Sequence, residues 1–367
     1  MRGSLGWRLA RRGALALSML AWVGTAEAGP PQGTPLMITL PPEVLGYAEG
    51  ANGLVVAGTF FSGGAFHWMP TSGVTKIGGT QGVAVSRDGK VIVGNALDQG
   101  GFENAAIWTG GTTWRVLGSV RSGAKPCDRL LSATFGANDD GRVIVGLAWD
   151  GCSYARAFRW EESTGVVDLG SLGGGRQSTR ANGVSGNGRV VVGWEQAADG
   201  FRQGAKWVDG KEELIKGPSG FVGEAFATNR DGSLIVGTNC DPMAYTGPPT
   251  GWTWTQAGGL KCYPVERPSW ALPRYYQAFM QATSDDGRVI GGALSFGLES
   301  QALVWFDGEP VFLRDYLRAH GIPDAFDGWV NTGFVTDVSN DGRTLVGYGA
   351  GPTTFQGYMI VLPEMGE

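Results

Sequence analysis

A short turn motif recurs seven times along the chain, and this repetition constrains the fold more than any other feature. Most copies read Ser or Asn, one further residue, then Asp-Gly or Asn-Gly, followed by an apolar run such as Val-Ile-Val. The anchor glycines are spaced 36 to 55 residues apart, at Gly53, Gly89, Gly141, Gly188, Gly232, Gly287 and Gly342. A tryptophan follows each of the first six anchors by 15 to 22 residues, at Trp68, Trp108, Trp160, Trp207, Trp254 and Trp305, and Ile360 takes this place in the seventh copy. The chain is therefore a row of one repeated supersecondary unit.

The local chemistry of each unit predicts four short antiparallel strands. Ser-x-Asp-Gly is typical of a tight turn in which the serine side chain accepts from the backbone and glycine adopts the left-handed region. This turn joins a first strand to the apolar second strand. A third strand carries alternating aromatic residues, as in Ala157-Phe158-Arg159-Trp160, and an apolar run such as Gly165–Leu169 supplies the fourth. We expect the repeated tryptophans to pack between neighbouring units.

Units of this size and composition predict an all-β, seven-bladed β-propeller, with residues 29–367 as a single propeller domain. The first strands are rich in small residues, which we expect to converge on the central axis. The seventh unit has too few residues after Ile360 for a fourth strand. We expect the N-terminal segment Leu36–Leu40 to supply that strand, to close the ring and to leave no open sheet edge there.

Three stretches resemble the HAF-type extracellular repeat of exported bacterial proteins: "GVAVSRDGKVIVG" at 82–94, "AFRW" at 157–160 and "LGSLGG" at 169–174. The C-terminal segments "FLRDYLRAHGI" and "DGWVNTGFVTDVSNDGRTLVGYGAGPTTFQGYMIVLP" are also similar to the way such proteins end. The resemblance covers nearly the whole chain after residue 28. It implies a β-rich exported repeat protein and implies no particular chemistry.

The first 28 residues have the pattern of a signal peptide: a basic start, an apolar core over Gly13–Thr25 and Ala26-Glu27-Ala28 as the cleavage site. We expect cleavage after Ala28 and a secreted or periplasmic product, with Arg11-Arg12 leaving the twin-arginine route open. Removal of these residues leaves 25 basic and 33 acidic side chains, a net charge of 25 − 33 = −8. This balance argues against a nucleic-acid partner. No later segment is long and apolar enough to span a membrane. We also expect the protein to be a monomer.

The loop after each second strand is where the copies differ, so we expect function there. In several copies this loop combines aromatic and acidic residues, which suits sugar rings. Arg180 and Glu224 occupy equivalent places before the first strands of adjacent units, where they could line a ligand site or form a plain ion pair. The candidate ligand-binding residues are Trp149, Asp150, Trp194, Glu195, Arg180 and Glu224.

These residues favour a non-catalytic propeller that binds an extracellular carbohydrate or another cell-surface polymer. Two alternatives stay open: a carboxylate-based glycoside hydrolase or polysaccharide lyase at the channel mouth, and a structural surface or matrix protein without a small-ligand site. We expect no catalytic residue, metal or cofactor, because the cysteines lack close pairs and the acids of Asp139-Asp140 are adjacent rather than alternate. An even number of cysteines in an exported chain predicts disulfides, Cys127 with Cys152 and Cys240 with Cys262.

Overall fold

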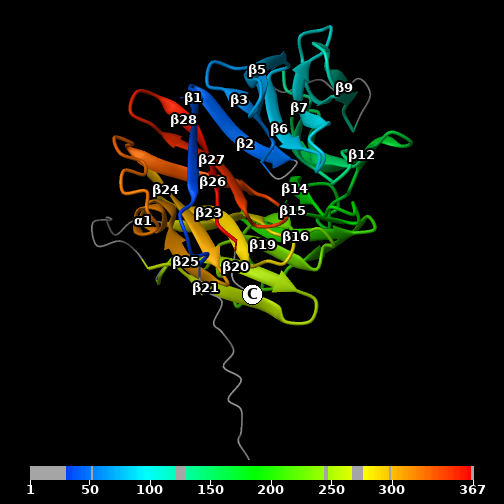
Figure 1. The fold of residues 1–367 in the computed structure, drawn as a ribbon. Helices are drawn as coiled ribbons and strands as arrows, with labels where there is room; N and C mark the ends of the chain where they lie inside the picture. Colours follow the sequence, from blue (N-terminus) through cyan, green and yellow to red (C-terminus); the bar gives the residue numbers. More distant parts are fainter. Residues whose placement is uncertain are drawn as a thin grey trace, which may run out of the picture.

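Seven four-stranded antiparallel sheets form a ring in the computed structural model, which describes residues 30–50, 53–120, 129–243, 247–266, 276–296 and 299–364. The innermost strand of each sheet contacts the innermost strands of both neighbours, and β26 contacts β2, so the circle closes. In Figure 1 the sequence colours run once around the molecule until the red strands return beside the blue ones. The predicted seven-bladed β-propeller is confirmed. The predicted signal peptide lies outside the described residues.

Each blade contributes one strand to each of four concentric layers. The first, innermost strands are β2 (Val44–Gly50), β6 (Gln81–Val85), β10 (Ser132–Ala137), β14 (Thr179–Val184), β18 (Ala225–Thr228), β22 (Gln277–Thr283) and β26 (Asn331–Val338). The second strands are β3 (Val55–Phe60), β7 (Ile92–Leu97), β11 (Ile144–Asp150), β15 (Val190–Gln196), β19 (Leu234–Thr238), β23 (Val289–Phe296) and β27 (Thr344–Ala350).

The third strands are β4 (Ala65–Met69), β8 (Glu103–Trp108), β12 (Tyr154–Glu161), β16 (Arg202–Val208), β20 (Thr250–Thr255), β24 (Glu299–Phe306) and β28 (Phe355–Val361). The outer strands are β5 (Gly73–Gly78), β9 (Arg115–Gly118), β13 (Gly165–Asp168), β17 (Lys211–Leu214), β21 (Gly259–Pro264), β25 (Glu309–Phe312) and β1 (Leu36–Pro42). A short helix, α1 (Leu313–Ala319), follows β25. The part of the chain that is described contains no helix long and apolar enough to cross a membrane.

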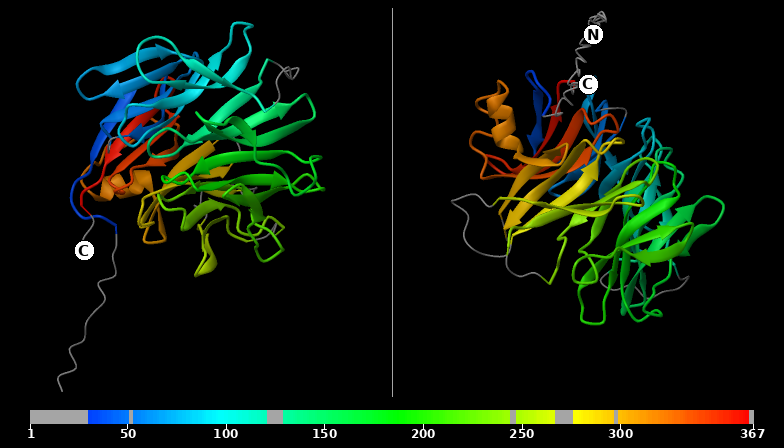
Figure 2. Two further views of the ribbon diagram at one scale, coloured as in Figure 1. Left: turned by 90° about the vertical axis from the view of Figure 1, so that its right-hand side faces the viewer. Right: turned by 90° about the horizontal axis from the view of Figure 1, so that it is seen from below.

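Strand β1 closes the ring as predicted, because it pairs antiparallel with β28 as the outer strand of the seventh blade. Its register places Leu36 opposite Val361 and Thr39 opposite Tyr358. Figure 2 shows β1 beside the red C-terminal strands from two further directions. The seventh sheet is thus made from both ends of the chain.

The Ser-x-Asp-Gly turns have the geometry expected from their sequence. In the second blade the Ser86 hydroxyl accepts from the Val91 N–H at 2.9 Å and donates to Asp88 at 2.8 Å. Gly89 has φ 72°, in the left-handed region that glycine adopts without strain. We call the side of the ring that carries these turns the turn face. The opposite side, with the second-to-third strand loops and the connections between blades, is the loop face.

The hydrophobic core consists of layers between neighbouring blades. One layer joins Val145 and Ala157 of the third blade to Val191 and Trp207 of the fourth. Trp207 is 1% exposed and Trp305 is fully buried, which confirms the expected packing of these repeated tryptophans. Burial of roughly 200 Å² per tryptophan contributes about 5 kcal/mol before entropy is counted. The repeated framework therefore holds the blades together, and function must lie at the axis or on the faces.

Candidate functional site

An axial cavity of about 210 Å³ lies between the innermost strands. Each of these strands carries a β-bulge at the same place, where one residue has no partner on the second strand. All seven bulged residues line the cavity, and each stands six residues before the anchor glycine of its unit, as Phe135 stands before Gly141. We call them the bulge ring: Tyr47, Val83, Phe135, Asn182, Phe226, Gln281 and Thr336.

Small residues converge on the axis as expected, and Ala84, Gly136 and Gly183 are among those that line the cavity. The bulge ring adds three aromatic residues to this lining, which the small residues did not predict. A Cβ atom on Gly183 would stand 2.9 Å from the carbonyl oxygen of Phe226 in the next blade, so neighbouring strands approach closely there.

Two arginines and two aspartates stand where the cavity reaches the turn face, and we call them the charged quartet: Arg87, Asp139, Arg230 and Asp285. Arg230 Nε lies 2.8 Å from Asp139 Oδ2, and Arg87 Nη1 lies 3.4 Å from the same oxygen. Arg87 Nη1 is also 3.8 Å from Asp285 Oδ2, which joins the second blade to the sixth. The four side chains remain 23% to 57% exposed, so the cavity opens to solvent here.

Gly186 makes the charged quartet possible. It occupies the equivalent place in the fourth blade, between Asp139 of the third and Arg230 of the fifth. A Cβ atom on Gly186 would stand 2.4 Å from Asp139 Oδ1 and 2.8 Å from Arg230 Cγ. The missing side chain therefore lets an aspartate and an arginine from non-adjacent blades meet. Burial raises the pKa of the Asp285 carboxyl above its ordinary value, while the Arg87 guanidinium opposes this.

Five aromatic rings form an arc that begins and ends in the bulge ring: Phe226, Phe279, Phe334, Tyr348 and Tyr47. Successive ring centroids lie 5.3 to 6.3 Å apart, from the fifth blade to the first. Burial, followed by the proximity of Tyr348, raises the pKa of Tyr47 to about 12, so its hydroxyl stays protonated at neutral pH. Tyr47 and Phe226 line the cavity, so its walls combine aromatic side chains with the charged quartet at the turn face.

Three of the six predicted ligand residues meet at the loop-face ends of the fourth and fifth blades. Arg180 Nη2 lies 2.8 Å from Glu224 Oε2, so the ion pair that we considered does form. Arg202, which the sequence did not single out, lies 2.5 Å from the other oxygen of Glu224. Burial lowers the pKa of Arg180, an effect that Glu224 opposes.

Trp194 is 6% exposed, so it does not offer the open stacking surface that we expected. The guanidinium carbon of Arg180 lies 5.4 Å from the Trp194 ring centroid, and that of Arg202 lies 4.5 Å from it. These are cation–π contacts, and they occupy the ring. Two arginines that share one carboxylate and one indole form a compact structural cluster.

Glu195 is also buried, at 2% exposure, and faces the connection between the third and fourth blades. Its Oε1 accepts from the Ser171 hydroxyl at 2.6 Å and from the Gly173 N–H at 2.8 Å. A second buried carboxylate, Glu212, accepts from the Leu172 N–H at 3.2 Å. Burial raises the pKa of Glu212 to about 8, and Glu195 adds to this shift. The two carboxylates hold the same three-residue segment.

Trp149 and Asp150 are half-buried at the loop-face end of β11. Asp150 Oδ2 lies 3.8 Å from the guanidinium of buried Arg156. The backbone N–H of Trp149 donates to the Leu131 carbonyl at 2.9 Å. Both residues are partly accessible to solvent. None of these contacts joins them to the cluster of Arg180, Arg202, Glu224 and Trp194.

Exposed apolar side chains concentrate on the loop face. Eleven large hydrophobic side chains are exposed among the described residues, and seven of them belong to this face: Phe61, Leu97, Leu172, Phe201, Met243, Val330 and Phe355. Phe61 and Phe355 stack on each other, with ring centroids 5.2 Å apart and planes at 29°. Phe61 lies in the loop after a second strand, the kind of loop in which we expected function, and Phe355 comes from the opposite end of the chain.

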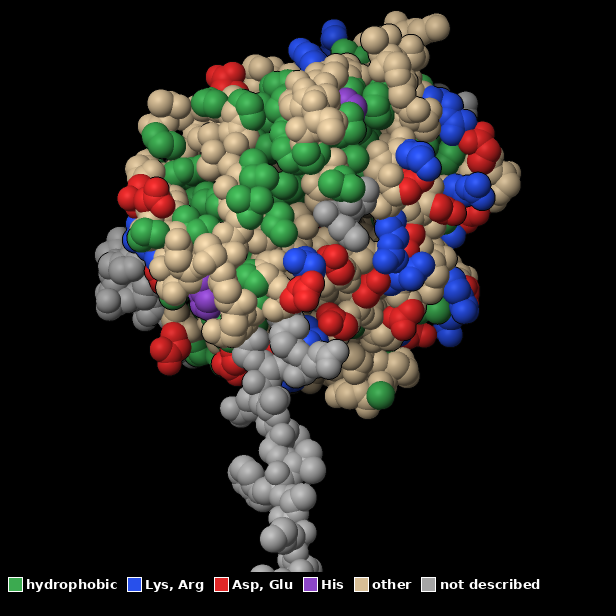
Figure 3. All heavy atoms as spheres, in the orientation of Figure 1, with side chains coloured by type: hydrophobic (Ala, Val, Ile, Leu, Met, Phe, Trp, Pro, Cys, Tyr) green, Lys and Arg blue, Asp and Glu red, His purple; other side chains and the backbone are tan. Residues whose placement is uncertain are grey.

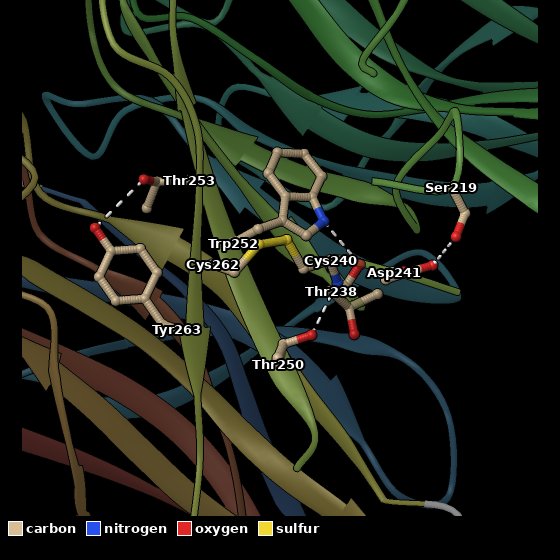
Figure 4. Close-up of a disulfide and its surroundings, with 9 residues drawn as sticks. All are labelled: Ser219, Thr238, Cys240, Asp241, Thr250, Trp252, Thr253, Cys262 and Tyr263. Carbon is tan, nitrogen blue, oxygen red and sulfur yellow. Dashed lines mark hydrogen bonds between the residues drawn. A yellow bond between two sulfur atoms is a disulfide. The ribbon is translucent and has the colours of Figure 1, made fainter. Parts of the chain in front are cut away.

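The predicted disulfide between Cys240 and Cys262 is present and joins the end of the second strand of the fifth blade to its outer strand. Figure 4 shows it beside Trp252, whose indole N–H donates to the Thr238 carbonyl at 2.7 Å. Cys152 is also disulfide-bonded, and its predicted partner Cys127 lies outside the described residues. Within the described ranges no group of three or more His, Cys, Asp or Glu side chains could hold a metal ion.

The face drawn in Figure 3 mixes positive and negative side chains and shows no single basic patch. Many charged side chains of the described residues are paired, such as Arg189 with Asp209 at 3.2 Å and Arg343 with Glu364 at 3.2 Å. This face therefore lacks the concentrated positive charge that nucleic-acid binding needs.

Comparisons with solved structures support the fold. The chain is similar to the β-propeller domain of the Trilobed protease from Pyrococcus furiosus, at 13% identity and a TM-score of 0.54, over 88% of this chain and 96% of that one. It is similar to an oligogalacturonate lyase in complex with manganese, at 13% identity and a TM-score of 0.53, over 92% and 99% of the two chains. U3-55K matches at 12% identity and a TM-score of 0.52, over 90% and 100%.

At these identities the likeness shows a propeller and nothing about activity. No family model matches the chain, and no curated protein matches it. Membership of the HAF-type repeat family stays a prediction.

Proposed function

We propose that this protein is an exported, non-catalytic binding propeller that recognises an extracellular carbohydrate or cell-surface polymer across its loop face. The observation that carries the proposal is the concentration of exposed large apolar side chains there, on loops that differ between otherwise repeated units. Single exposed apolar side chains are normal on a protein surface, whereas contiguous ones mark interaction sites, and Phe61 and Phe355 are in direct contact.

The stacked pair Phe61 and Phe355 is the best candidate platform. These rings are 58% and 39% exposed. The backbone of Glu43 joins the two residues, because its N–H donates to the Phe355 carbonyl and its carbonyl accepts from the Phe61 N–H. The Glu43 side chain is exposed, so an aromatic surface and a carboxylate acceptor stand side by side. Sugar rings need this combination, since their C–H faces stack and their hydroxyls donate hydrogen bonds.

The proposed contact surface therefore centres on the first and seventh blades. Trp149 and Asp150 of the third blade remain candidates. Trp194, Glu195, Arg180 and Glu224 are buried or paired with other side chains and support the loops. Retention of the mature protein, residues 29–367, on a panel of insoluble and immobilised polysaccharides tests the proposal. We expect Phe61→Ala with Phe355→Ala to weaken retention at least tenfold, because two stacking contacts are lost.

The matched control is Val116→Ala with Val167→Ala, which removes two exposed apolar side chains from outer strands β9 and β13. This variant should be retained like the parent protein. Equal retention of all three proteins, or no retention of the parent on any polymer, would contradict the proposal. In the second case a structural surface role becomes the better explanation.

A carboxylate-based hydrolase or lyase is a weaker candidate. Glu195 and Glu212 are two neighbouring carboxyl groups, and burial raises the pKa of Glu212 to about 8, as such chemistry requires of its general acid. Both are at most 9% exposed, however, and they hold a loop rather than line the cavity. Both carboxylate oxygens of Glu224 are paired with arginines, so this side chain belongs to the structural cluster.

A further inference from the structure

The bulge ring has the character of a recognition surface built into the scaffold. The turn motif repeats from blade to blade, yet the residue six places before each anchor is Tyr, Val, Phe, Asn, Phe, Gln or Thr. A structural role common to all blades would favour one residue type there. The seven side chains instead give one small cavity a varied, asymmetric lining.

Gln281 has hydrogen-bonding capacity that the protein does not use. Its Oε1 is buried and has no hydrogen-bond partner, while other atoms of the residue line the cavity. Asn182 differs, because its Oδ1 accepts from Arg180 at 2.6 Å and its Nδ2 donates to the Ala225 carbonyl at 2.8 Å. The Thr336 hydroxyl donates to backbone carbonyls, at 3.1 Å to Gly46, and its oxygen can still accept. A guest that donates hydrogen bonds would satisfy Gln281 once its side-chain amide turns towards the cavity, with Thr336 as a second acceptor.

The rest of the bulge ring is apolar and suits a flat or cyclic guest. Tyr47, Phe135 and Phe226 come from alternate blades, with Val83 between the first two. A volume of about 210 Å³ holds roughly ten water molecules or one six-membered sugar ring. The walls therefore offer aromatic faces at the scale of a single ring.

The charged quartet selects against an ionic guest. Its two positive and two negative groups add to zero and are paired with one another. Asp337, the other charged residue of the lining, accepts from the Val338 N–H at 2.9 Å. A guest with a net charge would bring that charge into a partly buried space without a free counter-ion, which is costly. A neutral guest passes the quartet without this cost.

We propose that the axial cavity is a second binding site, which takes a neutral, hydroxyl-bearing molecule of the size of one monosaccharide from the turn face. The guest donates hydroxyl hydrogen bonds to Gln281 and Thr336 and stacks against Phe226, because the Arg180 guanidinium already lies over the Phe135 ring, 4.6 Å from its centroid. The site is separate from the loop-face platform and does not depend on it.

Saturation-transfer NMR and calorimetry on residues 29–367 test this site. The neutral probes are D-glucose, D-galactose and myo-inositol, and the charged ones are D-glucuronate and D-glucosamine. We expect at least one neutral probe to bind and both charged probes to bind at least tenfold more weakly. Gln281→Ala should weaken the neutral probe about tenfold, and Phe226→Ala should do the same without a change in the charge preference.

Phe61→Ala with Phe355→Ala serves as the matched control and should bind the neutral probe like the parent protein. Thermal unfolding of each variant identifies any loss of fold. Gln281→Glu keeps the side-chain size and adds a charge, and its affinity for the neutral probe is a second measurement at the same position. No binding of any neutral probe, or binding that Gln281→Ala and Phe226→Ala leave unchanged, would overturn the proposal. These outcomes do not bear on polymer retention by the loop face, so the two proposals fail separately.

Discussion

Replacement of Glu212 by glutamine should stabilise the protein at mildly alkaline pH and not at acidic pH. Glu212 and Glu195 are buried acceptors that hold the segment 171–173, and Oε1 of Glu212 is buried without a donor. Burial, with Glu195 nearby, raises the pKa of Glu212 from 4.5 to about 8. The folded protein therefore keeps a proton on Glu212 that the unfolded chain loses.

The sign of the pH dependence follows from this difference. A carboxyl whose folded pKa is raised contributes its full stability below about pH 4.5 and loses it as the pH rises towards 8. One pH unit within this window changes the free energy of unfolding by about 1.4 kcal/mol per proton. Three units, from pH 4.5 to 7.5, give an upper value of about 4 kcal/mol, and we expect about 3 kcal/mol for a carboxyl coupled to Glu195.

In Glu212→Gln the amide oxygen can accept from the Leu172 N–H and the amide N–H₂ can donate to Glu195. We expect a free energy of unfolding close to that of the parent at pH 5 and about 3 kcal/mol higher at pH 7.5. Urea unfolding followed by tryptophan fluorescence at both pH values measures the two differences.

Glu213→Gln is the matched control, because Glu213 is half exposed and pairs with Lys206 at 2.9 Å. Loss of this pair should cost less than about 1 kcal/mol, with the opposite sign to the effect at Glu212. Equal effects of Glu212→Gln at both pH values, or destabilisation at pH 7.5, would refute the interpretation that the folded protein keeps a proton on Glu212.

Two further predictions concern the scaffold. Gly186→Ala should separate Asp139 from Arg230 and cost about 1 to 3 kcal/mol, measured by thermal unfolding; an unchanged melting temperature would mean that the charged quartet adjusts freely. Cys240→Ser with Cys262→Ser removes a cross-link between residues 22 apart and should cost about 3 kcal/mol, measured by urea unfolding without reductant; a difference under 1 kcal/mol would show that the loop is held by other contacts.

The blades could be predicted from the sequence because their signals are local. The turn serine, the aspartate and the left-handed glycine act within five residues of one another, as Ser86 and Val91 show. The closing strand β1 was also predictable, since the seventh unit lacked a fourth strand of its own.

The site was less predictable because its contacts join distant strands. The comparison of copies correctly marked Trp194 and Glu195 as unshared. Strand alternation then sends Trp194 towards Arg180 and Arg202 and Glu195 towards the segment before β14, and both become buried. Neither partner could be read from the repeat alone.

The bulge ring left a signal that sequence reasoning missed. When the seven copies are aligned on their anchor glycines, the residue type six positions before the glycine varies widely, from Val83 to Phe135. Regular strand alternation does not mark this position as special, because a bulge breaks the alternation. A search for varied positions next to small repeated residues would have found it.

The pairing of β1 with β28 sets an order of events during folding. Leu36 and Val361 are neighbours in space but are separated by roughly 320 residues of chain, and bringing such distant points together costs about 5 kcal/mol of chain entropy. β1 leaves the ribosome before β28, with six blades made in between, so it must wait unpaired until those blades exist. Closure is then a late step that turns a row of sheets into one cooperative unit.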